Sequence, residues 1–251
     1  MPLDRIQLSQ EILLAAIGND WPSEQVDAAI ELLASSEGKF PSGVRKLPAE
    51  LVRAVQRERL IVAMLRAASE LGYRGTNVQD VIERAGVSRP TFYEHFANKE
   101  DCFLASFDTS AKRLRDKVDA AARAGGDSWR DRVRLGLEAV LGFVHAEPDT
   151  ARTLIVEARA ASVDAVMRRV ELLDHFSNCL DTRARELLPE TSQRSEVTAS
   201  GVVGGVEALL YSRLCKGESE GIEELLPSMM YFAVLPYEGH EAASEELALA
   251  G

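Results

Sequence analysis

The stretch AGVSRPTFYEHFANKED, residues 85–101, carries the strongest structural signal in the chain. Gly86 can adopt the left-handed backbone conformation that ends a helix. Ser88 is placed to cap the next helix by accepting a hydrogen bond from the Thr91 amide. Pro90 falls in the first turn of that helix, where its missing N–H costs nothing. The stretch therefore predicts a helix, a tight turn and a second short helix.

The two sides of the short helix differ in chemistry. Phe92 and Phe96, four residues apart, form the side that packs inward. The side chains expected on the outer side are those of Arg89, Thr91, Tyr93, Glu94 and His95. In a helix-turn-helix the second helix offers such residues to the major groove of DNA, where arginine contacts guanine and hydroxyls donate to phosphates. The alternative is a helix pair inside another α-helical domain, with ordinary surface side chains.

The rest of the chain also follows helical periodicity. Apolar residues recur at helical spacing over residues 60–71, a second helix follows a predicted Asn77 cap, and another helix follows the short one after a predicted Asn98 cap. Further helices are predicted over 129–146, 149–161, 163–188, 192–216 and 221–235. No segment alternates with a period of two, so the predicted fold class is all-α.

Charge is unevenly distributed along the 251 residues, whose formal net charge is −11. Residues 1–38 carry −6, residues 39–108 carry +2, and residues 109–251 carry −7. The segment that contains the helix-turn-helix is therefore the one that suits a nucleic acid. The chain shows neither a leader peptide nor an apolar run of about 18 residues, so we expect a cytoplasmic protein without a membrane partner.

Residues 57–108, from RERLIV to CFLASFD, resemble the DNA-binding domain of the TetR family of bacterial transcriptional regulators. The resemblance implies a three-helix DNA-binding domain followed by a helical bundle that binds an effector and dimerises. It implies DNA contacts at Arg89, Pro90, Thr91, Tyr93 and His95, and phosphate contacts at Lys99, Thr76 and Asn77. At Asn77 the family more often has threonine, and both residue types cap helices.

The domains expected from this reading are a helical extension over 1–38, the DNA-binding domain with a basic arm over 39–108, and the effector-binding and dimerisation domain over 109–251. The acidic extension is not expected to touch DNA. Basic residues of the connector that follows it can reach phosphates beside the motif, as basic arms do. These are Lys39, Arg45 and Lys46.

The last two helices resemble those of an actinobacterial-type subgroup of the family, which implies that they pair with their counterparts in a homodimer. Small residues allow close approach and apolar residues supply contact area. The residues expected at this interface are Gly204, Gly205, Ala208, Leu209, Leu225, Met229 and Phe232, with Gly201, Leu210, Met230 and Leu235 beside them.

An effector pocket is expected among the helices between residues 129 and 188. The apolar candidates are Trp129, Val133, Leu137, Phe143, Leu154, Met167, Phe176 and Cys179, and the candidate polar anchors are His145, Glu157 and His175. Ordinary core packing is the alternative for each. His175 and Cys179 have a metal-compatible i, i+4 spacing, but two ligands without a third do not predict a metal site. The three cysteines, Cys102, Cys179 and Cys215, suit reduced, buried thiols.

Motifs for phosphate-loop, dinucleotide, zinc-protease and serine-hydrolase chemistry are missing from the sequence, so no enzyme and no cofactor are predicted. The predicted function is a homodimeric, ligand-responsive transcriptional repressor that binds a pseudo-palindromic double-stranded DNA operator. A small apolar or amphipathic effector releases it from the operator. The alternative is control by a protein partner through residues 1–38.

Overall fold

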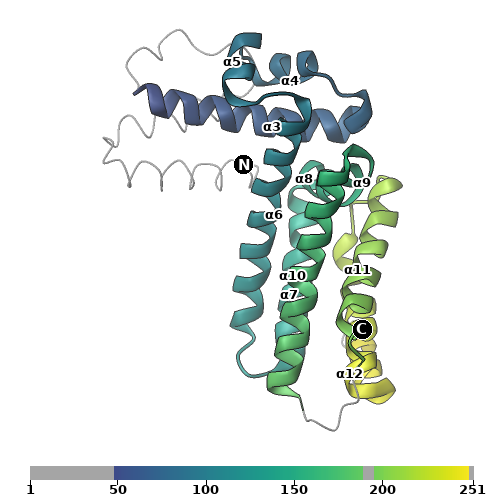
Figure 1. The fold of residues 1–251 in the computed structure, drawn as a ribbon. Helices are drawn as coiled ribbons and strands as arrows, with labels where there is room; N and C mark the ends of the chain where they lie inside the picture. Colours follow the sequence, from purple (N-terminus) through teal and green to yellow (C-terminus); the bar gives the residue numbers. More distant parts are fainter. Residues whose placement is uncertain (1–47, 189–194, 249–251) are drawn as a thin grey trace. The chain divides into compact units, whose positions relative to one another are not determined.

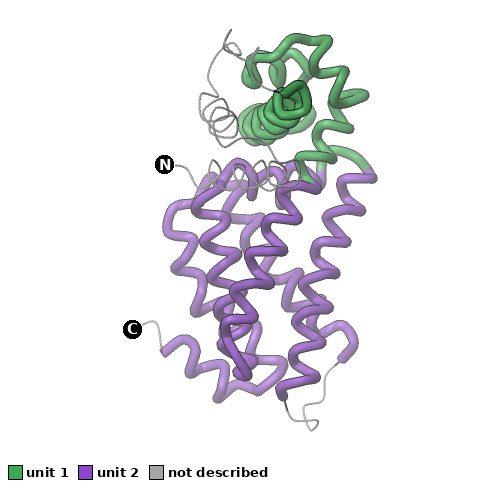
Figure 2. Tube along the Cα trace, turned by 90° about the vertical axis from the view of Figure 1, so that its left-hand side faces the viewer, with its two compact units in different colours: residues 1–107, 160–162 green, residues 108–159, 163–251 purple. Residues whose placement is uncertain are grey.

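A computed structural model describes residues 48–188 and 195–248 of the chain. The predicted helices of the 1–38 extension and the basic connector lie outside these residues. The described chain is helical and contains no strand, as predicted. It divides into two compact units, one formed by residues up to 107 with 160–162, and the other by 108–159 with the residues beyond 162 (Figure 2).

The described part of unit 1 contains three complete helices and the start of α6 (Figure 1). These are α3 (Ala49–Gly75), α4 (Val78–Ala85), α5 (Arg89–His95) and α6 (Lys99–Ala124). The helix predicted over 60–71 is confirmed, starts earlier at Ala49, and loses helical geometry at Gly72, where φ is 72°. Its Tyr73 ring packs edge-on against Phe103 at 4.7 Å, which ties α3 to α6.

The described part of unit 2 contains the remainder of α6 and the helices that follow it, apart from the last two residues of α9 (Figure 1). These helices are α7 (Trp129–Ala146), α8 (Pro148–Arg152), the π-helix η2 (Thr153–Glu157), α9 (Ala158–Ala161), α10 (Val163–Leu187), α11 (Thr198–Cys215), the 3₁₀-helix η3 (Ile222–Leu225) and α12 (Leu226–Ala248). The rings of Trp129 and Tyr237 pack at 4.7 Å in the core between α7 and α12. Arg130 adds ion pairs to Glu238 and Glu245 at 2.9 and 2.7 Å.

The helix predicted over 192–216 begins at Thr198, and two other predicted helices differ more strongly from the structure. Residues 149–161, predicted as one helix, contain the π turn of η2, in which the Ala158 amide donates to the Thr153 carbonyl five residues back. The helix predicted to end at 235 continues through Pro236 to Ala248, with a break at Gly239, where φ is 86°. A proline removes one hydrogen bond, and the packing of Tyr237 and the residues after it compensates.

Cys102 is buried, whereas Cys179 and Cys215 are exposed, so the prediction of three buried thiols is wrong for two of them. Across the two described ranges, no helix combines the length and the apolar character that a membrane span requires.

Candidate functional site: a DNA-reading helix and a cavity

The turn between α4 and α5 has the predicted geometry. The Asn77 side chain accepts from the Gln79 and Asp80 amides at 2.8 and 3.2 Å, and the Asp80 carboxylate accepts from the Asn77 amide at 2.8 Å. This reciprocal capping box starts α4. Gly86 ends it with φ 65° and ψ 31°, and the Ser88 hydroxyl accepts from the Thr91 amide at 3.2 Å to start α5. The local sequence therefore determines the helix-turn-helix.

One side of helix α5 is buried in the core, and the other side is exposed. Phe92 is completely buried and Phe96 is 3% exposed, as predicted. Arg89 and Pro90 are exposed, and the Tyr93 side chain is half exposed with its ring edge-on to Phe92 at 5.3 Å. Arg89 and Tyr93 are therefore placed to reach a partner without disturbing the core.

Two other predicted DNA contacts, Thr91 and His95, are less exposed to solvent. Thr91 is partly buried, and its hydroxyl shares a 2.8 Å hydrogen bond with Ser88. His95 is also partly buried rather than outward-facing, because its Nε2 atom lies beneath neighbouring side chains. Burial and the positive charges of Arg53 and Arg57 lower the pKa of His95, which favours the neutral ring.

The predicted phosphate contacts at Thr76 and Lys99 also have structural roles. The Thr76 side chain is buried, and its hydroxyl donates to the Gly72 carbonyl at 2.9 Å. The Lys99 ammonium donates to the carbonyls of Tyr73 and Thr76 at 3.0 and 2.9 Å and lies over the Tyr73 ring. An ammonium has three hydrogens, so one of them stays available for a phosphate.

Two arginines on α3 join the site although the sequence pattern does not single them out. Arg53 is exposed, and Arg57 lies over the Phe96 ring at 5.3 Å from its centroid. Both act electrostatically on His95, so their charges lie beside the end of α5. Nothing in the spacing of α3 distinguishes them from other surface arginines, and their candidacy rests on tertiary contacts alone.

This arrangement is that of a helix-turn-helix DNA-binding protein. Residues 60–106 match the family described as bacterial regulatory proteins, tetR family. This match places residues 60–106 in the TetR family of bacterial regulatory proteins. The chain's resemblance to the actinobacterial-type subgroup, made on the last two helices, stays a prediction.

Similar proteins have regulatory names. The chain is 29% identical over 116 residues to the HTH-type transcriptional activator FasR of Mycolicibacterium smegmatis. This alignment covers 46% of the chain and 52%, about half, of FasR. It is 25% identical over 194 residues to the uncharacterized HTH-type transcriptional regulator YdgC of Bacillus subtilis, covering 72% of this chain and 93% of YdgC.

A solved structure shares the fold over most of both chains. The transcriptional regulator FadR from Bacillus subtilis, solved in complex with stearoyl-CoA, superposes with a TM-score of 0.60. The superposition covers 72% of this chain and 98% of FadR, at 17% sequence identity. At that identity the likeness establishes a common fold.

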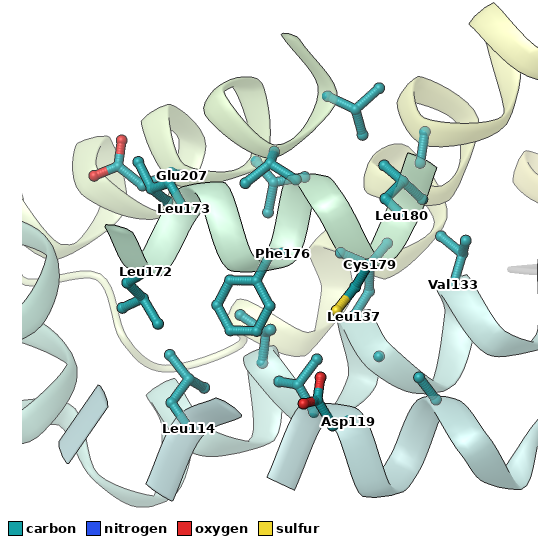
Figure 3. A pocket seen from close by; sticks show the side chains of 18 of the residues that line it. Leu114, Asp119, Val133, Leu137, Leu172, Leu173, Phe176, Cys179, Leu180 and Glu207 are labelled. Carbon is teal, nitrogen blue, oxygen red and sulfur yellow. The ribbon is translucent and has the colours of Figure 1, made fainter. Parts of the chain in front are cut away.

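Unit 2 contains a cavity of about 280 Å³ with a largely apolar lining (Figure 3). Of the predicted lining residues, Trp129, Val133, Leu137, Leu154, Phe176 and Cys179 are present. The π turn of η2 contributes Leu154 and Ile155. Residues outside the predicted range 129–188 complete the lining from α6, α11 and α12, among them Leu114, Val118, Asp119, Val202, Val206, Leu210 and Ala233. Helical periodicity marks these positions as apolar but does not show which helices enclose a space.

The other predicted pocket residues lie elsewhere. Phe143 is buried in the core, and Met167 is 52% exposed. His145 is exposed and pairs with Glu223 at 3.1 Å, while Glu157 is buried 3.5 Å from Arg152. His175 does not line the cavity. It contacts Asp119, which is one of the lining residues.

The predicted dimer residues divide between an exposed face and the core. Met229 and Met230 are fully buried and Leu210 is 3% exposed, so these three side chains pack within the protomer. The prediction that Met229 contacts the second protomer is therefore wrong. Leu209, Phe232 and Leu235 are 42%, 40% and 36% exposed. Gly205 packs directly against the Phe232 ring, since a Cβ there would lie 2.4 Å from it. Leu225 and Gly204 are partly buried, and Ala208 is exposed.

Proposed function

We propose that the chain is a homodimeric, ligand-responsive transcriptional repressor that binds a pseudo-palindromic DNA operator. The observation that carries this proposal is the exposure of Arg89 and Tyr93 on a helix that Phe92 anchors in the core. A helix presented in this way fits the major groove, where an arginine reads guanine and a tyrosine hydroxyl donates to a phosphate. The names of the relatives given above, which are those of transcriptional regulators, support the same proposal.

Dimerisation is supported by the face around Phe232. Leu209 and Leu235 are apolar and exposed beside it, and Gly204 and Ala208 are small enough for a second helix to approach closely. A two-fold dimer brings two copies of α5 to one operator, about 34–36 Å or a multiple of that distance apart.

The proposed effector is a small apolar or amphipathic molecule held in the cavity of unit 2. Half of the lining residues are leucine or valine. Its charged groups include Glu207, which Arg169 neutralises at 2.8 Å. The complex of FadR with stearoyl-CoA provides an example of an amphipathic ligand in this fold.

Helix α6 belongs to both units, and this continuity suggests how the effector acts. The helix contributes Phe103 and Phe107 to the core of unit 1 and Leu114 and Val118 to the cavity. We propose that this continuous helix couples effector binding to DNA affinity. The coupling can be no larger than the effector's preference between the two states of the protein.

The DNA-binding proposal is tested by selecting a binding site from a random duplex library with the full-length protein, and then measuring variants on it. Arg89→Ala is expected to weaken binding by about 1–3 kcal/mol, because a base contact is lost. Tyr93→Ala is expected to weaken binding as well, and both variants should sediment like the unmodified protein. Affinity should also fall steeply with salt, since phosphate contacts release counterions.

Arg185→Ala is the matched control, because this exposed arginine lies on α10 in unit 2 and its side chain is 71% exposed. It should bind the selected site as tightly as the unmodified protein. Equal affinity of Arg89→Ala and Tyr93→Ala with that control would refute the assignment of α5 as the DNA-reading helix.

A further inference from the structure

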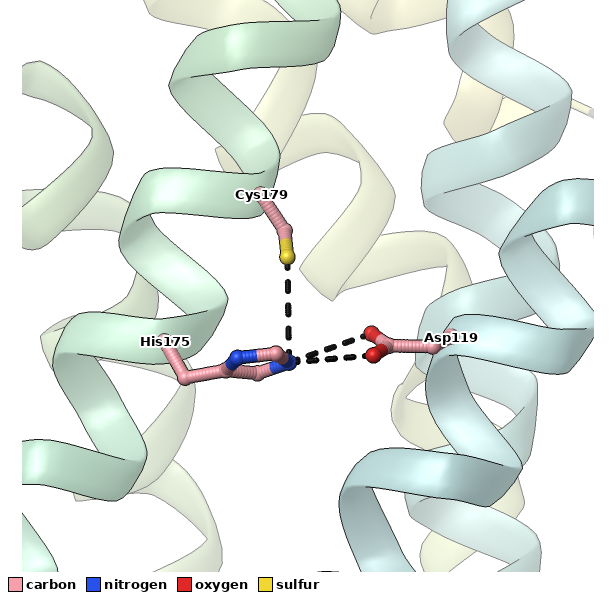
Figure 4. Close-up of side chains that lie close together, drawn as sticks. All are labelled: Asp119, His175 and Cys179. Carbon is pink, nitrogen blue, oxygen red and sulfur yellow. Dashed lines mark hydrogen bonds and ion pairs between the residues drawn. The ribbon is translucent and has the colours of Figure 1, made fainter.

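Three side chains of metal-ligand type meet beside the cavity of unit 2 (Figure 4). Asp119 comes from α6, and His175 and Cys179 lie one turn apart on α10. The His175 Nε2 atom is 3.1 and 3.2 Å from the two Asp119 carboxylate oxygens, and the Cys179 Sγ atom is 3.7 Å from the same nitrogen. All three donor atoms lie within 4.8 Å of one another. We propose that Asp119, His175 and Cys179 form a binding site for a divalent transition-metal ion, with zinc as the best fit.

The separations of the donor atoms suit a tetrahedral ion. Zinc bonds to sulfur at about 2.3 Å and to nitrogen or oxygen at about 2.0–2.2 Å, which places tetrahedral ligand atoms roughly 3.4–3.7 Å apart. The Cys179 to His175 separation of 3.7 Å matches this spacing, and the Asp119 to His175 separation of 3.1 Å is a few tenths shorter. The Asp119 to Cys179 separation is no more than 4.8 Å, so the ion requires a side-chain adjustment mainly between these two donors.

The chemistry of the three donors selects the metal. A thiolate, an imidazole and a carboxylate together favour zinc and similar borderline ions, whereas magnesium and calcium require oxygen ligands. The carboxylate of Asp119 and the thiolate of Cys179 supply two negative charges, which balance a divalent cation. Arg183, one turn after Cys179, is paired with Glu186 at 2.6 Å, which reduces its repulsion of an ion.

The site opens toward the cavity. Asp119 and Cys179 both line it, close to Phe176 and Leu137 (Figure 3). Three protein ligands leave the fourth position of a tetrahedral ion vacant, as in zinc sites that exchange water for another donor. A molecule with an apolar body and one carboxylate or thiol group is therefore the class of ligand that this position admits. The metal site requires unit 2 alone, so it goes beyond the proposed DNA-binding function and does not depend on it.

A simpler arrangement of the same residues is an ion pair between His175 and Asp119 with a neighbouring neutral thiol. Titration of the reduced, chelator-treated full-length protein with Co²⁺ distinguishes the two. The metal site predicts one equivalent of Co²⁺ per chain, with a thiolate-to-cobalt charge-transfer band and the visible bands of tetrahedral cobalt. Added Zn²⁺ should remove these bands, and added Mg²⁺ should leave them.

Variants assign the ligands. Cys179→Ser should abolish the charge-transfer band, and His175→Gln and Asp119→Asn should each weaken Co²⁺ affinity at least about tenfold, the loss that even a supporting residue causes. Cys215→Ser is the matched control, because Cys215 is the other exposed thiol among the described residues. Circular dichroism confirms that each variant keeps its helices.

A saturable band that disappears in Cys179→Ser and persists in Cys215→Ser supports the site. A titration without a saturable thiolate band overturns it, as does a band that survives Cys179→Ser or is lost equally in Cys215→Ser. Cobalt affinity unchanged in both His175→Gln and Asp119→Asn would also overturn it.

Discussion

The single residue on which the DNA-reading geometry depends most is Gly86. Its φ of 65° lies in the left-handed region, and its amide donates to the Ile82 and Glu83 carbonyls at the end of α4. The Val87 amide donates to the Ile82 carbonyl at 3.2 Å, which completes the helix end. This turn sets the direction in which α5 leaves α4, so the exposure of Arg89 follows from a backbone conformation that glycine adopts without cost.

Replacing Gly86 by alanine is expected to destabilise the protein by about 1–2 kcal/mol, the cost of a left-handed residue with a Cβ. Urea unfolding measures the change. Gly142→Ala on α7 is the control of opposite sign, because Gly142 lies inside a helix and a Cβ added there would meet no heavy atom within 4 Å. It should be neutral or stabilise by up to about 1 kcal/mol. The same sign and size for both variants would contradict the role of the turn.

At the scale of the elements, a buried ion pair joins α6 to the junction of α7 and α8. Arg113 Nη2 lies 2.5 Å from Glu147 Oε1, and the two side chains are 6% and 3% exposed. Glu147 directly precedes Pro148, where α7 ends and α8 begins. The pair therefore fixes the position of these helix ends beside α6, and residues of α6 and α7 also line the cavity.

Arg113→Ala is expected to lower the free energy of unfolding by about 3–5 kcal/mol, because it removes the Arg113 charge from the buried Glu147 carboxylate. The double variant Arg113→Met with Glu147→Leu should recover most of that loss, since an apolar pair of similar volume removes both charges. Thermal or urea unfolding of the single and double variants provides the measurement. A double variant as unstable as Arg113→Ala would show that the charges themselves are needed.

At the scale of the whole molecule, the proposed function requires two copies. The exposed apolar side chains of Leu209, Phe232 and Leu235 offer contact area on α11 and α12, while Met229 and Met230 stay in the protomer core. The exposed part of this face is therefore smaller than the sequence suggests, and Phe232 contributes its largest side chain.

Phe232→Glu is expected to weaken the homodimer at least about thirtyfold, since a buried aromatic anchor contributes about 2 kcal/mol or more to an interface. Analytical ultracentrifugation over a concentration series measures this change. Met167→Glu is the control, because Met167 is 52% exposed and lies on α10, whereas the proposed face lies on α11 and α12. A dimer that resists Phe232→Glu, or one that both variants weaken equally, would argue against this face.

The capping box of Asn77, the turn at Gly86 and the burial of Phe92 could all be predicted from the sequence, because each depends on residues within a few positions along the chain. The same local rules indicated the course of α7 and α10. They missed the π turn of η2 and the continuation of α12 past Pro236, where packing outweighs local preference. They also placed His145 and Met167 in a pocket that the structure builds without them.

Contacts distant in the sequence depend on the tertiary structure alone. His175 and Cys179 were recognisable as neighbours on one helix face, but Asp119 reaches them only because α6 packs beside α10. The cavity likewise draws on α6, α11 and α12 as well as the helices between them. Helix formation is governed by hydrogen bonds and caps that span about four residues, whereas a cavity or a ligand cluster is defined by which helix faces meet in space.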